Sequence, residues 1–352
     1  MIKTTPTQAL LAWYRKTKRS LPWRINAEPY RIWISEIMLQ QTRVEVVIPY
    51  YEAFLRQFPD VDSLARAPLS PVLAAWSGLG YYRRARYLHK AARVIAGKRG
   101  GFPGSSRELR QLPGIGPYSA AAIASIAFGE VIAAIDGNVE RVAGRYLALE
   151  QNPRRPEGRR RIAALATSLV DRKSPGDSNQ ALMELGATVC IPRQPRCAQC
   201  PLEPGCEGCR SGRPEDFPPK QLRPATKTVR LIVAVARRDK DVLLFCRPEE
   251  STQMAGLWEL PWVEWCGPRR AESLLGERYG GRWNLGPRSG RVLHTITNRR
   301  LRLEVYGASL RSAGEIREAR EAGWFSPDEL GRLATSSQVA KVLACLAPSE
   351  EA

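Results

Sequence analysis

The stretch Leu112-Pro113-Gly114-Ile115-Gly116-Pro117-Tyr118-Ser119-Ala120 decides the fold of the N-terminal part of this 352-residue chain. It lies between a helical pattern at residues 106–111 and a run of small residues at 120–128 that favours a second helix. Gly114 and Gly116 allow a tight turn that leaves backbone N–H groups exposed at the start of that helix. Such donors suit a phosphate group. An ordinary helix–helix turn with a glycine cap explains the two glycines equally well.

Helical patterning extends on both sides of this stretch, from residue 6 to about residue 189. Apolar residues recur there every three or four positions, and strand signals are nearly absent. One helical segment places a single acid, Glu36, among Trp33, Ile37 and Met38. Burying an acid on an apolar face is costly, so Glu36 is a candidate for chemistry. The alternative is a glutamate satisfied by a helix cap or an ion pair.

The composition changes after residue 210, which indicates a second domain. Residues 211–224 contain four prolines and few apolar side chains, as an extended connector would. Beyond it, alternating patterns predict strands at 229–235, 242–245 and 301–305, and helices at 271–279 and 337–346. We therefore expect a multidomain chain: an all-α domain at 1–210, a linker at 211–226 and a small α+β domain at 227–348.

The charge of the chain predicts a polyanionic partner. The formal net charge is +19, and residues 1–220 alone hold 33 basic and 19 acidic side chains. Nucleic acid is the natural partner of such a surface, although a merely solvated basic surface is the alternative. The sequence holds no run of about 18 apolar residues, and its first twenty residues lack the apolar block of a signal peptide. We expect no membrane association and a cytoplasmic location, at the nucleoid if the chain is bacterial.

Five of the eight cysteines fall within twenty residues, which indicates a metal site. Four of them follow the spacing C-x6-C-x2-C-x5-C, and these are Cys190, Cys197, Cys200 and Cys206. Four thiolates can hold a 4Fe-4S cluster, and zinc is the chemical alternative. We expect Cys209, three residues farther on, to be a bystander that could compete with Cys206.

These motifs resemble those of known DNA repair enzymes. The stretch 112–120, followed by Ile135-Asp136-Gly137-Asn138-Val139-Glu140-Arg141-Val142, resembles the helix-hairpin-helix of base-excision glycosylases. The cysteine spacing resembles the cluster loop of endonuclease III, which implies a 4Fe-4S cluster at 190–206. From residue 11 to about 206 the strongest resemblance is to adenine DNA glycosylases of the MutY type. The resemblance is carried by residues 21–24, 33–42 and 78–82. Glu36, within 33–42, separates this branch from endonuclease III.

The resemblance implies a role for each residue of the active site. Glu36 corresponds to the general acid that protonates adenine N7 and positions the water, and Asp136 to the carboxylate that stabilises the positive sugar. Burial would raise the pKa of Glu36, whereas amides at a helix start would keep Asp136 ionised. Relatives that also cut the strand carry a nucleophilic lysine where this chain has Tyr118. The resemblance thus implies a monofunctional enzyme in which Tyr118 and Asn138 orient the acid, water or sugar.

The same resemblance implies the contacts to DNA. Arg24, Leu39 and Gln180 correspond to the adenine pocket, and Gly114 and Gly116 to the phosphate-binding hairpin. Tyr81 corresponds to the wedge that fills the stack, supported by Leu79, while Gln41 and Thr42 contact the strand with 8-oxoguanine. At each polar position, a side chain that merely satisfies the backbone is the alternative.

The C-terminal domain resembles the Nudix-like domain of the same family, on residues 256–261 and 324–330. Its helix offers only Glu272 and Glu277 toward magnesium, so we expect no pyrophosphohydrolase activity. The family reads 8-oxoguanine through a Phe-Ser-His loop, which here is Ile296-Thr297-Asn298. Thr297 keeps a hydroxyl for the lesion, while Asn298 replaces the imidazole.

Together these features predict an enzyme that hydrolyses the N-glycosidic bond of adenine paired with 8-oxoguanine or guanine. The expected partner is duplex DNA with such a mispair, and we expect a monomer. One alternative is a thymine or uracil mismatch glycosylase of the same superfamily. Another is a catalytically silent DNA-binding protein with a redox cluster. The presence of Glu36 and Asp136 favours the adenine glycosylase.

Overall fold

The structure is a computed structural model that describes residues 4–98, 101–219, 225–251, 254–296, 298–311 and 319–346. The chain divides into two compact units. The first unit comprises Met1–Arg66 and Tyr87–Leu222, and the second comprises Ala67–Arg86 and Arg223–Ala352. In the described part of the chain, no helix is both long and apolar enough to cross a lipid bilayer.

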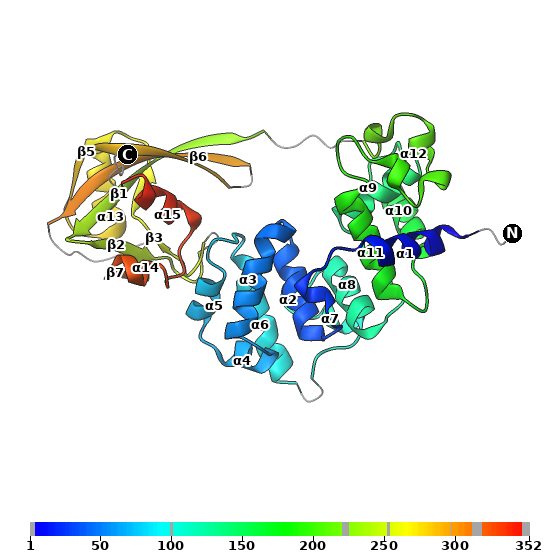
Figure 1. Cartoon of the computed structure of the whole chain (residues 1–352). Coiled ribbons are helices and arrows are strands. Elements are labelled where there is room, and N and C mark those ends of the chain that lie inside the picture. Colours follow the sequence, from blue (N-terminus) through cyan, green and yellow to red (C-terminus); the bar gives the residue numbers. More distant parts are fainter. Residues whose placement is uncertain are drawn as a thin grey trace, which may run out of the picture. The chain divides into compact units, whose positions relative to one another are not determined.

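The first unit is helical, as the sequence predicted (Figure 1). Its helices are α1 (Pro6–Thr17), α2 (Pro29–Leu39), α3 (Val44–Gln57), α4 (Val61–Arg66), α7 (Ser106–Leu109), α8 (Pro117–Phe128), α9 (Gly137–Tyr146), α10 (Pro156–Ser168), α11 (Pro175–Thr188) and α12 (Glu207–Arg210). Short 3-10 helices are η1 (Pro22–Arg24), η2 (Cys197–Gln199), η3 (Glu203–Gly205) and η4 (Pro214–Asp216). Helix α5 (Leu69–Ala75) lies in the second unit, and α6 (Arg83–Ala96) crosses the boundary between the units.

Helix α8 organises the centre of the first unit. It contains five alanines, and Ala120, Ala122 and Ala124 are fully buried, so neighbouring helices can approach its backbone closely. Helices α2 and α11 both pack against it. The apolar core continues around α9, α10 and α11, where Val139, Ala181 and Leu185 are buried. This packing brings residues from α2, α8, α9 and α11 to one place.

The second unit is an α+β fold with a mixed sheet (Figure 1). Its strands are β1 (Lys227–Arg238), β2 (Asp241–Cys246), β3 (Trp258–Glu259), β4 (Trp262–Glu264), β5 (Trp283–Ile296), β6 (Arg299–Leu310) and β7 (Glu321–Phe325). The order is β3-β2-β1-β6-β5; β4 pairs with β1 and β7 with β2. Strands β1 and β6 are parallel, and β5 and β6 form an antiparallel hairpin.

Helices cover parts of both faces of this sheet. Alternate residues of β1 and β6 face two separate cores. Leu231 and Leu303 belong to the core that includes Val339 of α15 (Ser337–Ala344), and Ile232 and Tyr306 belong to the core of α13 (Pro268–Tyr279). The short helix α14 (Pro327–Leu330) follows β7. The expected strands and helices are confirmed, while β3, β4, β5 and β7 were not predicted.

Candidate active site

A cavity of about 630 Å³ in the first unit gathers most of the predicted site residues. It is bordered by residues of α2, α8, α9 and α11 and by the loops before them. The predicted residues that line it are Arg24, Glu36, Leu39, Gln41, Thr42, Gly114, Gly116, Tyr118, Asp136, Asn138 and Gln180. The structure therefore joins segments that are more than a hundred residues apart in the sequence.

Glu36 lies on α2 and is only 6% exposed. Its Oε2 lies 2.9 Å from the hydroxyl of Tyr118. Burial raises the pKa of Glu36 to about 7, helped by the nearby charge of Asp136, while the Tyr118 hydrogen bond and the Arg24 charge act in the opposite direction. The prediction of a raised pKa is confirmed, and the cavity therefore holds an acid that is partly protonated near neutral pH.

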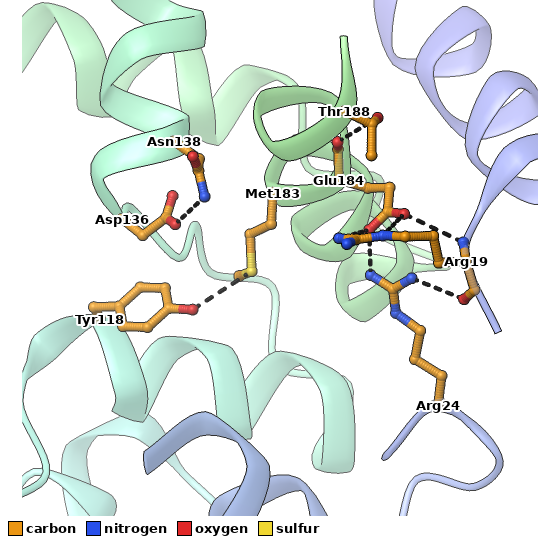
Figure 2. A network of polar contacts seen from close by, with 8 residues as sticks. All are labelled: Arg19, Arg24, Tyr118, Asp136, Asn138, Met183, Glu184 and Thr188. Atoms are coloured by element: carbon orange, nitrogen blue, oxygen red, sulfur yellow. Dashed lines mark hydrogen bonds and ion pairs between the residues drawn. The ribbon is translucent and has the colours of Figure 1, made fainter. Parts of the chain in front are cut away.

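Tyr118 lies in the first turn of α8, which begins at Pro117 after the cap Gly116. Its hydroxyl also lies 3.5 Å from Sδ of Met183 (Figure 2). Burial and the two carboxyl groups of Glu36 and Asp136 raise the pKa of Tyr118 well above its usual value. The hydroxyl therefore keeps its proton and can donate a hydrogen bond to the Glu36 carboxylate.

Asp136 caps the N-terminus of α9. Its Oδ1 accepts a hydrogen bond from the Val139 amide at 2.7 Å. Its Oδ2 accepts one from Nδ2 of Asn138 at 3.0 Å (Figure 2). Arg141 in turn donates to Oδ1 of Asn138 at 2.7 Å. Burial nevertheless raises the pKa of Asp136 by more than these bonds lower it. The expected amide is present. The sequence predicted that such amides keep Asp136 ionised, but that prediction left out burial, which disfavours the charged form.

An ion pair beside the cavity was missed in the sequence. The buried carboxylate of Glu184 on α11 accepts hydrogen bonds from Nε of Arg19 at 2.7 Å and from Nη2 of Arg24 at 2.8 Å (Figure 2). Arg24 also donates to the Arg19 carbonyl at 3.1 Å. Burial raises the pKa of Glu184, but the two arginines lower it by more, to about 2. Glu184 follows the predicted site residue Gln180 by four positions, or about one helical turn, so the two side chains share a helix face. This spacing was the signal in the sequence that could have identified Glu184.

The hairpin before α8 needs a glycine at residue 114. Gly114 has φ +78°, and a Cβ there would lie 2.5 Å from Cβ of Tyr87. It follows the end of α7 by five residues, so it is not the cap of that helix. A Cβ on Gly116 would meet open space. Packing explains Gly114, and a phosphate contact of either glycine stays a prediction.

The predicted wedge lies in the second unit, in the loop between α5 and α6. Tyr81 is 43% exposed with φ +49°, and Leu79 is buried. The guanidinium of Arg84 stacks 5.4 Å from the Tyr81 ring. The hydroxyls of Ser77 and Tyr82 donate to the Thr335 carbonyl at 2.9 and 2.6 Å. Contacts to the C-terminal fold therefore hold the loop that carries Tyr81.

The predicted reader loop is the turn between β5 and β6. Thr297 lies outside the described residues. Asn298 is exposed, and its carbonyl accepts a hydrogen bond from the Lys227 amide at 2.9 Å. With Ile296 it borders a cavity of about 290 Å³ in the second unit, which both apolar and charged side chains line. The structure thus places Leu79, Tyr81 and Asn298 in the second unit, whereas the residues that line the first cavity belong to the first unit.

The cysteine loop closes around a small cavity of about 30 Å³. Its lining includes Cys190, Cys197, Cys200, Cys206 and Cys209. Arg145 adds a positive charge, with Nη1 3.5 Å from Sγ of Cys190. Among the described residues, no group of three or more His, Cys, Asp or Glu side chains is placed so that it could hold a metal ion. Cysteine thiolates are the ligands that hold iron–sulfur clusters, and the five thiols line this one cavity.

Comparisons with known proteins agree with this arrangement. The family model of the HhH-GPD superfamily base excision DNA repair protein matches residues 34–167, and that of the NUDIX domain matches residues 232–345. The human protein named adenine DNA glycosylase is 36% identical, over 95% of this chain and 72% of its own length. The mouse adenine DNA glycosylase is 34% identical, over 95% of this chain and 76% of its own length.

The chain belongs to the adenine DNA glycosylase family. An adenine DNA glycosylase of Buchnera aphidicola subsp. Baizongia pistaciae is 42% identical, over 57% of each chain. Among solved structures, a thermostable thymine-DNA glycosylase resembles this chain with a TM-score of 0.54 and 29% identity, over 58% of this chain and 95% of its own. The thymine enzyme is thus a relative in the superfamily, and the human and mouse adenine DNA glycosylases match both units.

Proposed function

We propose that this chain is a monofunctional adenine DNA glycosylase, which hydrolyses the bond between adenine and C1′ of deoxyribose in duplex DNA. The observation that carries the proposal is the contact between Glu36 and Tyr118 in a cavity that Asp136 also lines. Membership of the adenine DNA glycosylase family supports the choice of base. The site combines an acid that is partly protonated near neutral pH with a second carboxyl group, as cleavage of a glycosidic bond requires.

Glu36 supplies the proton. When the glycosidic bond breaks, both of its electrons leave with the base and C1′ becomes positively charged. With a pKa of about 7, Glu36 can give its proton to N7 of the departing adenine at neutral pH. The carboxylate that results can take a proton from the water that adds to C1′. This second transfer restores the acid and completes the hydrolysis.

Asp136 stabilises the positive sugar in its ionised form. Bonds from the Val139 amide and the Asn138 side chain hold both of its oxygens in place. These bonds favour the charged form, whereas burial opposes it. A carboxylate that is held but poorly solvated gains most when a cation forms beside it. Asn138 acts as a positioning residue, because Arg141 fixes its amide toward Asp136.

The described residues that line the first cavity do not include the amine that a strand-cutting enzyme uses. Strand cleavage through an imine requires an amine nucleophile. Among the described residues that border the first cavity there is no lysine, and the hairpin position carries Tyr118. A phenol cannot form an imine with the sugar. The product is therefore an intact strand with an abasic site.

The base opposite adenine is 8-oxoguanine or guanine in this proposal. Gln41 and Tyr81 support it, since both have the positive φ that non-glycine residues rarely adopt, at +58° and +49°. Such strain is retained where a side chain has a task. Gln41 and Thr42 contact the opposite strand, Tyr81 fills the stack above Leu79, and Thr297 and Asn298 read the lesion.

We also propose a 4Fe-4S cluster on Cys190, Cys197, Cys200 and Cys206, a monomeric state and a cytoplasmic location. The thiols that line one cavity support the cluster. A cluster bound there would join four points of loop 190–206 and so fix its conformation. It would take no part in the glycosidic step. The domain boundaries at 210 and 226 likewise stay a proposal.

The direct test is a panel of duplexes carrying A:8-oxoG, A:G, T:G or U:G. Free base and alkali-sensitive strands are measured under single turnover, with and without borohydride. We expect release of adenine from the first two duplexes, strand breaks only after alkali, and no borohydride trapping. Release of thymine or uracil without adenine would support the mismatch glycosylase instead. Efficient trapping would contradict the monofunctional mechanism.

A further inference from the structure

Four arginines surround one buried carboxylate on the sheet of the second unit. Glu304 on β6 is 0% exposed. Its oxygens lie 2.8 Å from Nε of Arg302, 3.3 Å from Nη2 of Arg230, 3.3 Å from Nη1 of Arg288 and 3.3 Å from Nε of Arg291. The side chains of these arginines are 34 to 52% exposed. We call these five residues the arginine cluster.

The strand pairing places the cluster on one face of the sheet. Glu304 is paired with Arg291 of β5, and Arg302 lies between Arg230 of β1 and Leu293 of β5. Residues two apart on a strand share a face, so the exposed Arg300 continues the row toward the β5–β6 turn. The opposite face carries the core of Leu301, Leu303 and Val305.

The charges of this cluster do not balance. One carboxylate offsets a single positive charge, so four arginines around Glu304 leave a net charge of about +3 on this patch. Burial raises the pKa of Glu304, but the arginines lower it by more, and the carboxylate stays ionised. Each guanidinium has five N–H donors, most of which the bonds to Glu304 leave available. Like charges held together destabilise the free protein unless an anion binds them.

The cluster is also preorganised. Glu304 fixes the four side chains from the centre, and the guanidinium of Arg230 stacks 3.9 Å from the ring of the exposed Trp265. A planar guanidinium held in place loses little entropy when its fork binds two oxygens of a phosphate. Leu293, which is 62% exposed, lies beside the cluster. The patch is therefore a basic surface with fixed donors.

We propose that the arginine cluster, extended by Arg300, binds the phosphate backbone of DNA away from the mispaired base. This inference rests on the proposed function, since it takes duplex DNA as the ligand. Backbone phosphates fit better than an acidic protein segment because the same two strands end at the turn of Ile296 and Asn298. Guanidinium groups along those strands can follow a backbone that passes the turn.

The test is the salt dependence of binding. Log affinity falls as log salt rises, and each lost phosphate contact makes this negative slope shallower by about 0.9. The expected changes in slope are changes in its magnitude. Arg288→Gln/Arg291→Gln should therefore lower the slope for a duplex with a central A:8-oxoG by roughly 2 and weaken binding at low salt about tenfold or more. The rate of adenine release from saturated enzyme should not change. The matched control is Arg269→Gln/Arg270→Gln, which removes two exposed arginines from α13.

Replacing Arg288 and Arg291 removes two ion-pair partners of the buried Glu304 carboxylate and could unfold the protein, so a melting curve is measured for each variant. Arg300→Gln covers that case, because it removes one charge from the same face and leaves the four arginine contacts of Glu304 in place. Its slope should fall by about 1. Slopes that match the α13 control overturn the inference and leave an acidic protein as the occupant. A wild type that binds DNA but releases no adenine would instead contradict the proposed function.

Discussion

The hydroxyl of Tyr118 lies 2.9 Å from Oε2 of Glu36, although the two residues are 82 positions apart in the chain. Burial drives the Glu36 carboxyl toward its protonated form, and this hydrogen bond moderates the effect. The balance sets the pKa near 7, where the group can both give and regain a proton. The contact therefore links the hairpin before α8 to the chemistry of α2.

Tyr118→Phe should shift the pH profile of adenine release to higher pH. The wild-type rate should fall as pH rises through about 7, because Glu36 loses its proton. A hydrogen bond to a charged carboxylate contributes roughly 1.5–3 kcal/mol. Its removal raises the pKa of Glu36, and the pH at which the rate falls, by about one to two pH units. Single-turnover rates across the pH range provide the measurement. An unchanged alkaline limb would show that Tyr118 does not tune Glu36.

Glu36→Gln should stabilise the fold at alkaline pH. The folded pKa of about 7 exceeds the ordinary 4.5, so the folded chain binds more protons than the unfolded chain between these values. Stability contributed by Glu36 is complete below about 4.5 and is lost as pH rises through 7. The glutamine variant avoids this loss, which amounts to roughly 3 kcal/mol. Urea unfolding near pH 4 and pH 8 measures it, with the exposed Glu52→Gln as control. Equal pH dependence in wild type and variant would contradict the prediction.

Glu184→Gln should weaken both the fold and the reaction. The change leaves Arg19 and Arg24 beside a neutral amide, and breaking a buried pair costs roughly 3 kcal/mol. Arg24 also borders the first cavity, so adenine release should slow. Because the folded pKa of Glu184 is about 2, its contribution is present above about 4.5 and is lost as pH falls toward 2. Denaturation curves at neutral and acid pH test this, and equal stability at neutral pH would refute it.

The purified chain should be straw-brown and contain about four irons if loop 190–206 holds the cluster. Cys200→Ser should lower the iron content and the visible absorption, since its thiol lines the cavity in the loop. Cys209→Ser should change neither. Metal analysis of protein purified without air provides the measurement. Stoichiometric zinc without iron would overturn the cluster, and iron loss in Cys209→Ser would make that residue a ligand.

Local patterns predicted the main helices and the strands β1, β2 and β6, but not the parts that depend on tertiary packing. Strand β5 was missed because its pairing with β6 is interrupted between Leu285 and Gly290, where Pro287 and two glycines obscure the alternation. Strand β7 pairs with β2, which is about 80 residues earlier in the chain. Such partners leave no periodic signal of their own.

The sequence predicted site residues that belong to motifs, and it predicted burial only where the apolar neighbours lie on the same helix. Burial by other segments of the fold could not be predicted. The raised pKa of Glu36 followed from its apolar neighbours on one helix. The net rise in the pKa of Asp136 did not, because its burial arises from other segments of the fold. Glu184 and the arginine cluster were also missed, since Arg19, Arg24 and the strands around Glu304 meet only after folding.

Proton transfer from Glu36 to adenine N7 is the central claim, and an analogue that lacks N7 tests it most directly. Duplexes carrying adenine or 7-deazaadenine opposite 8-oxoguanine are compared under single turnover, with wild type and Glu36→Gln. The account predicts that wild type releases adenine, that both proteins bind both duplexes, and that the other three combinations are slower by roughly a thousandfold. Release of 7-deazaadenine within tenfold of adenine, or of adenine by the variant within tenfold of wild type, would contradict it.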